Sequence, residues 1–226
     1  SSKDRLQKIV NEIDHDFGVK DRLASQRGNA MLVAKSIYDA CRYYELFQKS
    51  GLSGKVAVVT SYNPSTRDTV TEDGEEGTET QKRYVYNTYE NLLKDVDEKS
   101  GMTKAEVYED YAKDKFKTEP ANMKLLIVRD KLLTGFDAPA CTYLYIDKSM
   151  KDHGLFQAIC RVNRLDTDDK EFGYIVDFMD LLDEVNGAIS VYTEELDDDS
   201  GEKGCDILMK DRLKIAKKRL DDALEK

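Results

Sequence analysis

Five short apolar segments constrain the fold of this chain more than any other feature. They are residues 30–34, 55–61, 125–128, 142–146 and 172–178. A run that is apolar at nearly every position fits a strand buried on both faces, because a strand with one solvated face would alternate. Helical patterns lie between the runs, at 37–48, 82–98, 103–118 and 152–163. The sequence therefore predicts an α/β fold with a mostly parallel sheet, helices on both faces and right-handed crossovers.

Further helices are expected to flank this core. Residues 3–17 repeat apolar side chains at helical spacing, and residues 180–192 and 206–225 have helical character. Residues 62–81 are polar and predict a surface loop. We therefore expect a helical lead-in at 1–28, a sheet domain at 29–183 with a helical insertion at about 82–118, and a linker with the start of a helical region at 184–226.

The composition restricts the classes of protein to which the chain can belong. Its net charge is −10, with 40% hydrophobic and 35% charged residues. Such acidity argues against a domain that wraps nucleic acid over its whole surface, although a local basic patch is still compatible with it. The four cysteines lie far apart and the two histidines have no cysteine or histidine at zinc spacing, so we expect reduced thiols and no metal site. No apolar run is long enough to span a bilayer.

The predicted helix at 152–163 carries a polar stripe with two arginines. At 100° per residue, Gln157, Arg161 and Arg164 share one face. The opposite, apolar face holds Leu155, Ile159 and Val162. The apolar stripe should be buried, which turns the guanidinium groups outward. Arginine stays charged and its planar fork pairs with phosphate oxygens, so this face suits a phosphate group.

The segment 132–139 follows the run at 125–128 and combines several groups that bind ligands. Thr134 offers a hydroxyl, Gly135 permits close backbone approach, and Asp137 offers a carboxylate. In open parallel sheets, ligands bind beyond the carboxyl ends of the strands, and the segment is expected there. Taken alone, however, T-G-x-D-x-P is also an ordinary tight turn in which Asp137 acts only as a cap.

Taken together, the two segments resemble a known family. L-L-T-G-F-D-A-P followed by Q-A-I-C-R-V-N-R is similar to motifs V and VI of superfamily two helicases. More narrowly, both resemble the motor (R) subunit of type I restriction enzymes. The similarity covers residues 125–178, and G-N-A-M-L-V-A-K-S at 28–36 resembles the motif IV strand, whereas 61–119 match only loosely. The resemblance implies the second RecA-like (P-loop NTPase-type) lobe of an ATP-dependent DNA motor.

The resemblance also implies roles for individual residues. Arg161 and Arg164 match the arginines that reach the ATP γ-phosphate bound on the partner lobe. Positions that approach the nucleotide are matched by Gly135, Asp137 and Gln157. Positions that hold the phosphate backbone of the tracked strand are matched by Lys35, Ser36, Thr60 and Thr134. Cys160 departs from the pattern, since many family members carry a small residue there.

Some expected motifs are missing. No G-x-x-x-x-G-K-[ST] occurs, and the nearest string, at 51–55, is too short and precedes a strand. The sequence also lacks a cluster of acidic residues with a lysine, which would indicate a nuclease centre. The resemblance therefore places ATP and Mg²⁺ mainly on a first RecA-like lobe of the same longer chain. The implied parent is a cytoplasmic ATP-dependent type I site-specific deoxyribonuclease. Its partners are duplex DNA and the modification and specificity subunits, with no membrane, and this fragment alone is expected to be inactive.

Two alternatives stay open at this point. Motifs V and VI are shared widely, so the chain could be the same lobe from a repair helicase or a type III restriction enzyme. Only the D-A-P and R-V-N-R details favour type I restriction. The other alternative is a non-catalytic RecA-like docking module, which would bind a partner through helices 82–118 or 206–225. Its arginine stripe would then be a solvated face, the usual fate of surface arginines.

Overall fold

The computed structural model describes residues 2–64, 78–133, 135–150, 152–162, 166, 170 and 172–181. The predicted helix at 206–225 and nearly all of the one at 180–192 lie outside these residues. The domain boundaries derived from the sequence therefore stay predictions. Among the helices of the described part, none combines the length and the apolar character needed to cross a membrane.

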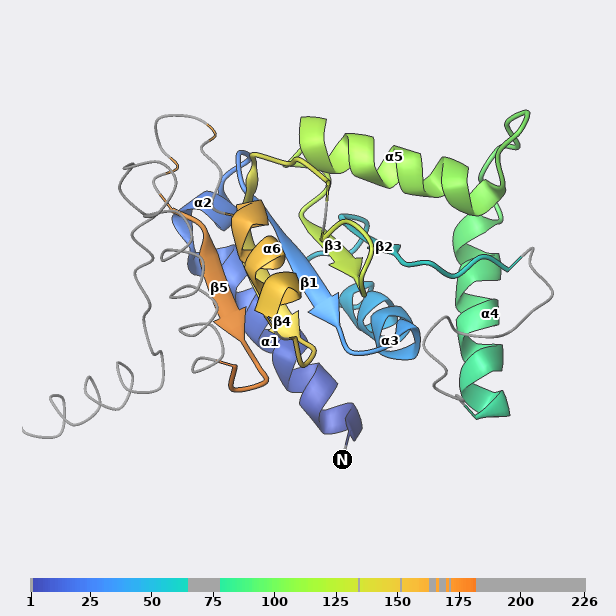
Figure 1. Cartoon of the computed structure of the whole chain (residues 1–226), viewed down its shortest axis with the longest axis horizontal. Coiled ribbons are helices and arrows are strands. Elements are labelled where there is room, and N and C mark those ends of the chain that lie inside the picture. The colour runs from blue at the N-terminus through green and yellow to red at the C-terminus, as the bar shows by residue number, and fades with distance from the viewer. Residues whose placement is uncertain are drawn as a thin grey trace, which may run out of the picture. The chain divides into compact units, whose positions relative to one another are not determined.

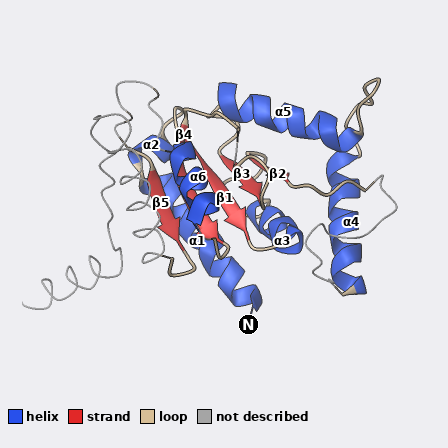
Figure 2. Ribbon diagram, viewed as in Figure 1, coloured by secondary structure: helices blue, strands red, loops and turns tan. Residues whose placement is uncertain are grey.

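A five-stranded sheet with only parallel pairs forms the centre of the domain (Figure 2). Its strands are β1 (Asn29–Ala34), β2 (Val56–Val59), β3 (Leu125–Val128), β4 (Cys141–Asp147) and β5 (Tyr174–Asp177). Their order is β2-β3-β1-β4-β5. Every residue of β1 to β4 is buried, as the apolar runs predicted. At the sheet margin, β5 is buried only in part, with Tyr174 45% exposed, because it is an edge strand.

Helices cover both faces of this sheet (Figure 1). The layer on one face consists of α1 (Ser2–Val19), α2 (Asp21–Ala24) and α3 (Ile37–Phe47), which share a core with Ala30, Leu32 and Ala34 of β1. Met31 and Val33 alternate with these residues and point to the other face. There, α5 (Lys104–Thr118) packs against β2 and β3, and α6 (Asp152–Val162) packs against β4. The predicted α/β fold class is therefore confirmed.

The first helix belongs to the core of the domain. Leu6, Val10 and Ile13 of α1 are at most 2% exposed and pack into the cluster that includes β1 and β3. Two buried carboxylates also connect it to β4. Tyr145 donates its hydroxyl to Asp16 on α1 at 3.0 Å, and Arg5 on α1 forms an ion pair of 2.5 Å with Asp147. Apolar packing and polar contacts together hold α1 against the sheet.

Asp147, at the end of β4, also binds α3. Tyr43 is fully buried and donates its hydroxyl to Oδ2 of Asp147 at 2.5 Å. Burial and this carboxylate raise the pKa of Tyr43 far above its ordinary value. Because Asp147 is only 2% exposed, its charge depends on Tyr43 and Arg5 for compensation.

Side-chain caps fix the starts of three helices. Ser36 accepts a hydrogen bond from the Asp39 amide at 3.0 Å and caps α3, as a serine directly before a helical pattern predicts. Thr103 and Glu106 have the spacing that predicts a capping box, and they form one at the start of α5. The start predicted for α4 (Glu79–Leu93) is wrong by three residues. Thr78 and Gln81 form a second capping box within the stretch assigned to the surface loop.

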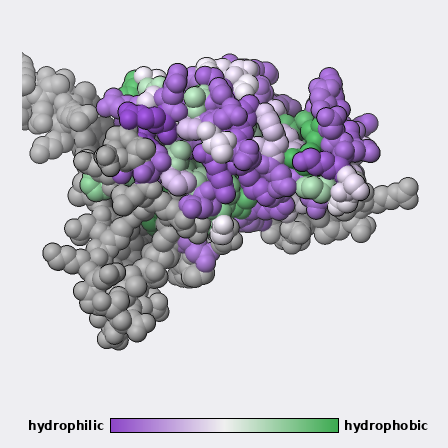
Figure 3. Space-filling model, turned by 90° about the horizontal axis from the view of Figure 1, so that it is seen from above, coloured by the Kyte–Doolittle hydropathy of each residue, from purple (hydrophilic) through white to green (hydrophobic). Residues whose placement is uncertain are grey.

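The tyrosine-rich region at 82–118 serves mainly for packing. Val85, Tyr89 and Leu93 of α4 share a hydrophobic cluster with Ile37 and Cys41 of α3. Figure 3 views the molecule from above the orientation of Figure 1, and the described residues on that face are mostly hydrophilic, with small hydrophobic patches. Tyrosines that recur at helical spacing predict a packing surface, and the buried members of this stripe confirm that prediction.

Buried tyrosines predict a loss of stability at alkaline pH. Burial raises the pKa of Tyr108, and of Tyr43 and Tyr89, above the ordinary value. Above about pH 10 the unfolded chain therefore releases phenolic protons that the folded chain keeps. The unfolded state then binds fewer protons, so the free energy of unfolding falls as pH rises. Urea titrations of this chain at pH 8, 10 and 11 measure that fall.

Two variants measure how much the Tyr108 hydroxyl contributes to this loss of stability. The Tyr108 hydroxyl accepts only a long hydrogen bond, 3.4 Å from the Val58 amide, so Tyr108→Phe should cost little at pH 8. Between pH 10 and 11 it should lose about 1 kcal/mol less stability than the parent. Tyr111→Phe is the matched control, because Tyr111 is 56% exposed, and it should follow the parent. If the free energy of unfolding depends on pH in the same way in all three proteins, a raised pKa of Tyr108 is contradicted.

Candidate functional site

The candidate site residues lie at the two ends of the parallel strands. Lys35 and Ser36 directly follow β1, and Thr60 directly follows β2, so all three lie at the carboxyl end of the sheet. Lys35 is exposed, Ser36 is half-buried and Thr60 is 5% exposed. The structure thus brings together three of the four predicted nucleic-acid contacts. The fourth, Thr134, lies outside the described residues.

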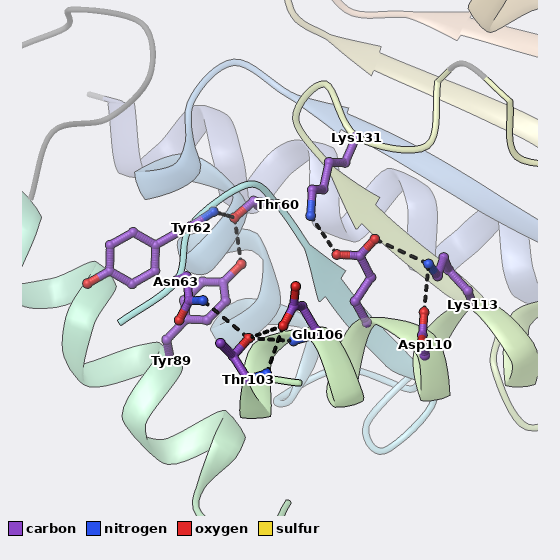
Figure 4. Close-up of polar contacts among 10 residues, drawn as sticks. Thr60, Tyr62, Asn63, Tyr89, Thr103, Glu106, Asp110, Lys113 and Lys131 are labelled. Atoms are coloured by element: carbon purple, nitrogen blue, oxygen red, sulfur yellow. Dashed lines mark hydrogen bonds and ion pairs between the residues drawn. The ribbon is translucent and has the colours of Figure 1, made fainter. Parts of the chain in front are cut away.

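The Thr60 hydroxyl is engaged inside the domain (Figure 4). Its oxygen lies 2.6 Å from the hydroxyl of Tyr89 on α4 and accepts a hydrogen bond of 3.2 Å from the Tyr62 amide. Asn63 continues this chain of contacts by donating to the Thr103 hydroxyl at 3.2 Å. These contacts fix the segment after β2 against α4 and α5. The Tyr89 contact could not be predicted from the sequence, because that residue also fits a packing stripe.

Charges beside this segment are balanced by α5 (Figure 4). Lys131, which follows β3, forms an ion pair of 2.6 Å with Glu109. Glu109 also pairs with Lys113 at 3.3 Å, and Lys113 pairs with Asp110 at 2.8 Å. Positive charge at this end of the sheet is therefore partly neutralised, and Lys35 is the exposed lysine nearest the start of α3.

The expectation that the whole segment 132–139 lies at the carboxyl end is wrong. The Phe136 ring packs 6.1 Å from the ring of Phe116, measured between centroids. The Phe116 carbonyl accepts a hydrogen bond of 2.7 Å from Asn29, the first residue of β1. Phe136, and with it Asp137, is therefore at the amino end. The reason is topological: β4 is parallel to β3, so the connection between them must cross the sheet before β4 begins.

The backbone of this connection turns sharply at two residues. Gly135 has φ +69°, a left-handed conformation that glycine adopts at little cost. Leu132 has the same φ, which is strained for a residue with a branched side chain. An added Cβ at Gly135 would meet no atom within 4 Å, so the conformation and not crowding calls for glycine. Gly135 and Asp137 are both exposed beside this turn.

Helix α6 runs back from the end of β4 and presents its predicted apolar stripe to the sheet. Leu155, Ile159 and Val162 are at most 3% exposed, while Gln157 on the polar side is half-buried. Arg161 is the next-to-last residue of α6, but its side chain and the whole of Arg164 lie outside the described residues. The apolar half of the predicted stripe is confirmed, and the direction of the guanidinium groups stays a prediction.

The chain beyond α6 contacts the start of β4. Asp166 forms an ion pair with Arg22 of α2, and Arg22 donates to the Thr142 hydroxyl at 3.0 Å. Lys170 is 3% exposed and donates to the carbonyls of Pro139 at 2.5 Å and Cys141 at 2.8 Å. Burial lowers the pKa of Lys170 to about 8. The sequence predicted none of these contacts, because a lysine or arginine in a polar stretch usually lies on the surface.

These observations define a class of protein. The chain is an open, all-parallel α/β domain whose candidate contacts divide between the two ends of its strands. The chain belongs to the family described as type I restriction enzyme subunit R domain 3, whose model matches residues 26–180. That range includes the whole sheet, from β1 to β5, and all but the first two described helices.

Curated relatives agree with this family. The MjaIXP endonuclease subunit of Methanocaldococcus jannaschii, a type I restriction enzyme subunit by its assigned name, is 34% identical over 194 residues. The SauMRSORF196P endonuclease subunit of Staphylococcus aureus strain MRSA252 is 29% identical over 202 residues. These matches cover 86% and 85% of this chain but only 16% and 20% of the relatives. The chain thus spans a fifth or less of their length.

Two solved structures have distant likeness to this chain, both at 13% sequence identity. Domain 2 of the DEAD-box helicase Mss116p, bound to an RNA duplex, has a TM-score of 0.43 and covers 83% of this chain and 55% of that one. The Type ISP restriction-modification enzyme LlaBIII, bound to DNA, has a TM-score of 0.28 and covers 72% of this chain and 12% of that one. At these values the likeness carries no conclusion about ligands.

Proposed function

We propose that this chain is the second RecA-like lobe of the DNA-translocating subunit of a type I restriction endonuclease. It would complete an ATP site whose phosphate loop and Mg²⁺ lie on a first lobe. One observation supports this most directly: the Asp137 segment and the end of α6 both lie at the amino end of the sheet, where Lys170 binds the carbonyl of Pro139. In this proposal the two motif-like segments face one surface, and the strand-end candidates Lys35 and Ser36 contact DNA at the other end of the sheet.

At the amino end the proposed chemistry is electrostatic. Arg161 and Arg164 would stabilise the negative charge that develops on the γ-phosphoryl group during transfer. Gly135, Asp137 and Gln157 would approach the nucleotide and orient it. When bound by the first lobe, Mg²⁺ would neutralise phosphate charge. This chain would supply the remaining cationic groups only when the cleft between the lobes closes.

At the carboxyl end the proposed role is contact with the phosphate backbone of DNA. The start of α3 presents a positive helix end, and Lys35 adds a formal charge beside it. Ser36 already uses its hydroxyl to cap the Asp39 amide, so it would contribute through its position at the helix start. Thr60 would act by holding the neighbouring backbone, since its hydroxyl is shared with Tyr89. Thr134 is proposed as the fourth contact.

Cycles of ATP binding and hydrolysis would then close and open the cleft and move duplex DNA past the enzyme. In this proposal the parent subunit works in the cytoplasm together with modification and specificity subunits, and the isolated chain hydrolyses ATP negligibly. The family match favours this reading over a lobe from a repair or type III restriction helicase. It also favours a motor lobe over a non-catalytic docking module.

A pair of charge reversals tests the DNA contact. Lys35→Glu in the complete motor subunit should weaken binding of duplex DNA about tenfold at low salt, because one phosphate contact becomes repulsive. It should also reduce the slope of log affinity against log salt by about one. Fluorescence anisotropy over a series of KCl concentrations measures both quantities.

Lys55→Glu is the matched control. Lys55 is also exposed and borders a strand, but it precedes β2 and therefore lies at the amino end of the sheet. Its reversal should change the affinity less than twofold. Equal losses for the two variants, or no loss for Lys35→Glu, would refute DNA contact at the carboxyl end.

A further inference from the structure

Three consecutive backbone carbonyls at the start of β4 are each held by a side chain with little or no exposure. Lys170 donates to the carbonyls of Pro139 and Cys141, at 2.5 and 2.8 Å. The carbonyl between them, of Ala140, accepts from the Thr142 hydroxyl at 3.0 Å and from the Asn29 amide at 3.2 Å. This stretch begins two residues after Asp137, so the position of Asp137 depends on these contacts.

A second cation extends this arrangement to α2. Arg22 donates from Nε to the Thr142 hydroxyl at 3.0 Å, and its guanidinium pairs with Asp166. Its side chain is 10% exposed and that of Asp166 is 24% exposed. We call Arg22, Thr142, Asp166 and Lys170 the amino-end network. It joins three stretches of chain that are far apart in sequence: α2, the start of β4 and the segment beyond α6.

The short helix that carries Arg22 is itself held firmly. Lys124 is buried and donates to the carbonyls of Leu23 and Gly28, at 3.1 and 3.0 Å. An added Cβ at Gly28 would lie 2.4 Å from the Arg22 carbonyl oxygen, so only glycine allows the chain to return this closely past α2. The backbone of Arg22 therefore has little freedom to shift.

Packing alone does not explain a lysine at position 170. A buried ammonium group is costly, and burial lowers the pKa of Lys170 to about 8. An apolar side chain of similar size would fill the same volume without that cost. What lysine adds is a donor to two carbonyls of the connection that carries Asp137. The network therefore fixes a loop at the expense of burying charge.

We propose that Arg22 and Lys170 are positioning residues for ATP turnover. They hold the Asp137 segment at a fixed place relative to the end of α6, so that both meet the nucleotide together when the lobes close. This inference rests on the function proposed above. Displacement of a reacting group by about 1 Å can lower a rate about a hundredfold, so loosening this network should affect the chemical step.

Kinetics of the complete motor subunit at saturating duplex DNA test the inference. Arg22→Gln and Lys170→Met should each lower the kcat for ATP by about 10- to 100-fold and leave the KM for ATP within about twofold. The double variant should lose less than the product of the two separate losses, because both act through one loop. Lys170→Arg keeps a cationic donor and should recover most of the loss. Asp110→Asn, which removes an exposed ion pair on α5, is the matched control.

The outcomes separate this inference from the proposed function. A normal kcat in Arg22→Gln and Lys170→Met would overturn the inference while leaving the motor function intact, provided that Arg164→Ala is inactive. Loss of kcat together with a large rise in KM and a lowered melting temperature in every variant, including Lys170→Arg, would indicate a merely structural role and also overturn it. Full turnover in Arg164→Ala would refute the proposed function itself.

Discussion

Arg164→Ala, and separately Arg161→Ala, is expected to lower DNA-stimulated ATP turnover of the complete motor subunit by about a thousandfold or more. The phosphoryl group that is transferred spreads negative charge over its oxygens, and a guanidinium group placed against them in a closed, water-poor cleft stabilises that charge. Because a first lobe would carry the other phosphate contacts in the proposed motor, ATP affinity should fall much less than turnover. DNA affinity should stay within about twofold, since α6 ends at the amino end of the sheet.

Steady-state ATP hydrolysis with and without duplex DNA measures this effect, and DNA affinity is followed in parallel. Arg83→Ala is the matched control, because Arg83 is an exposed arginine on α4, a helix that packs on α3. Arg164→Lys should recover little, since an ammonium group lacks the planar fork that pairs with two oxygens at once. Turnover within about threefold of the parent in both alanine variants would end the motor interpretation of these arginines.

Tyr43→Ala is expected to destabilise this chain by about 3–5 kcal/mol. The ring is fully buried between α3 and the sheet, so its removal leaves a cavity. The change also removes the hydroxyl that donates to Asp147 at 2.5 Å, which leaves a buried carboxylate with less compensation. Urea unfolding at pH 7, followed by circular dichroism, gives the free energy of unfolding directly.

Tyr43→Phe separates the hydrogen bond from the packing. It keeps the ring and should cost about 1.5–3 kcal/mol, the range for a hydrogen bond to a charged group. Tyr44→Phe on the same helix is the control, since Tyr44 is only half-buried, and it should stay within about 0.5 kcal/mol of the parent. If Tyr43→Phe is as stable as Tyr44→Phe, the Asp147 contact contributes nothing measurable.

Local patterns predicted the elements of this fold well. Continuous apolar runs predicted all five strands of the described sheet, because β1 to β4 are buried along their whole length and leave no polar alternation. Ser36 and the Thr103–Glu106 pair were predicted as helix starts, since capping depends on residues three apart. The same chemistry at Thr78 and Gln81 was overlooked because it lies inside a polar stretch. Its residues give little other sign of helix.

Contacts between distant parts of the chain could not be predicted from the sequence. The position of Asp137 depends on the path of a connection across the sheet, and the loop sequence does not encode that path by any periodicity. Arg22 and Lys170 bind partners up to 144 residues away, and neither has a pattern that distinguishes it from a solvated cation. The places of Lys35, Ser36 and Thr60 beside strand ends could be predicted, because that relation survives small errors in strand bounds, whereas their contact with nucleic acid stays a prediction.

The packing of α1 against the sheet has a practical consequence for expression of this domain in isolation. The family model begins at residue 26, which leaves α1 outside the matched range. Yet Leu6, Val10 and Ile13 shield one side of the β-strands from water, and Arg5 neutralises a carboxylate there. A shortened chain that begins at residue 26 would expose this apolar surface to water and promote self-association during expression.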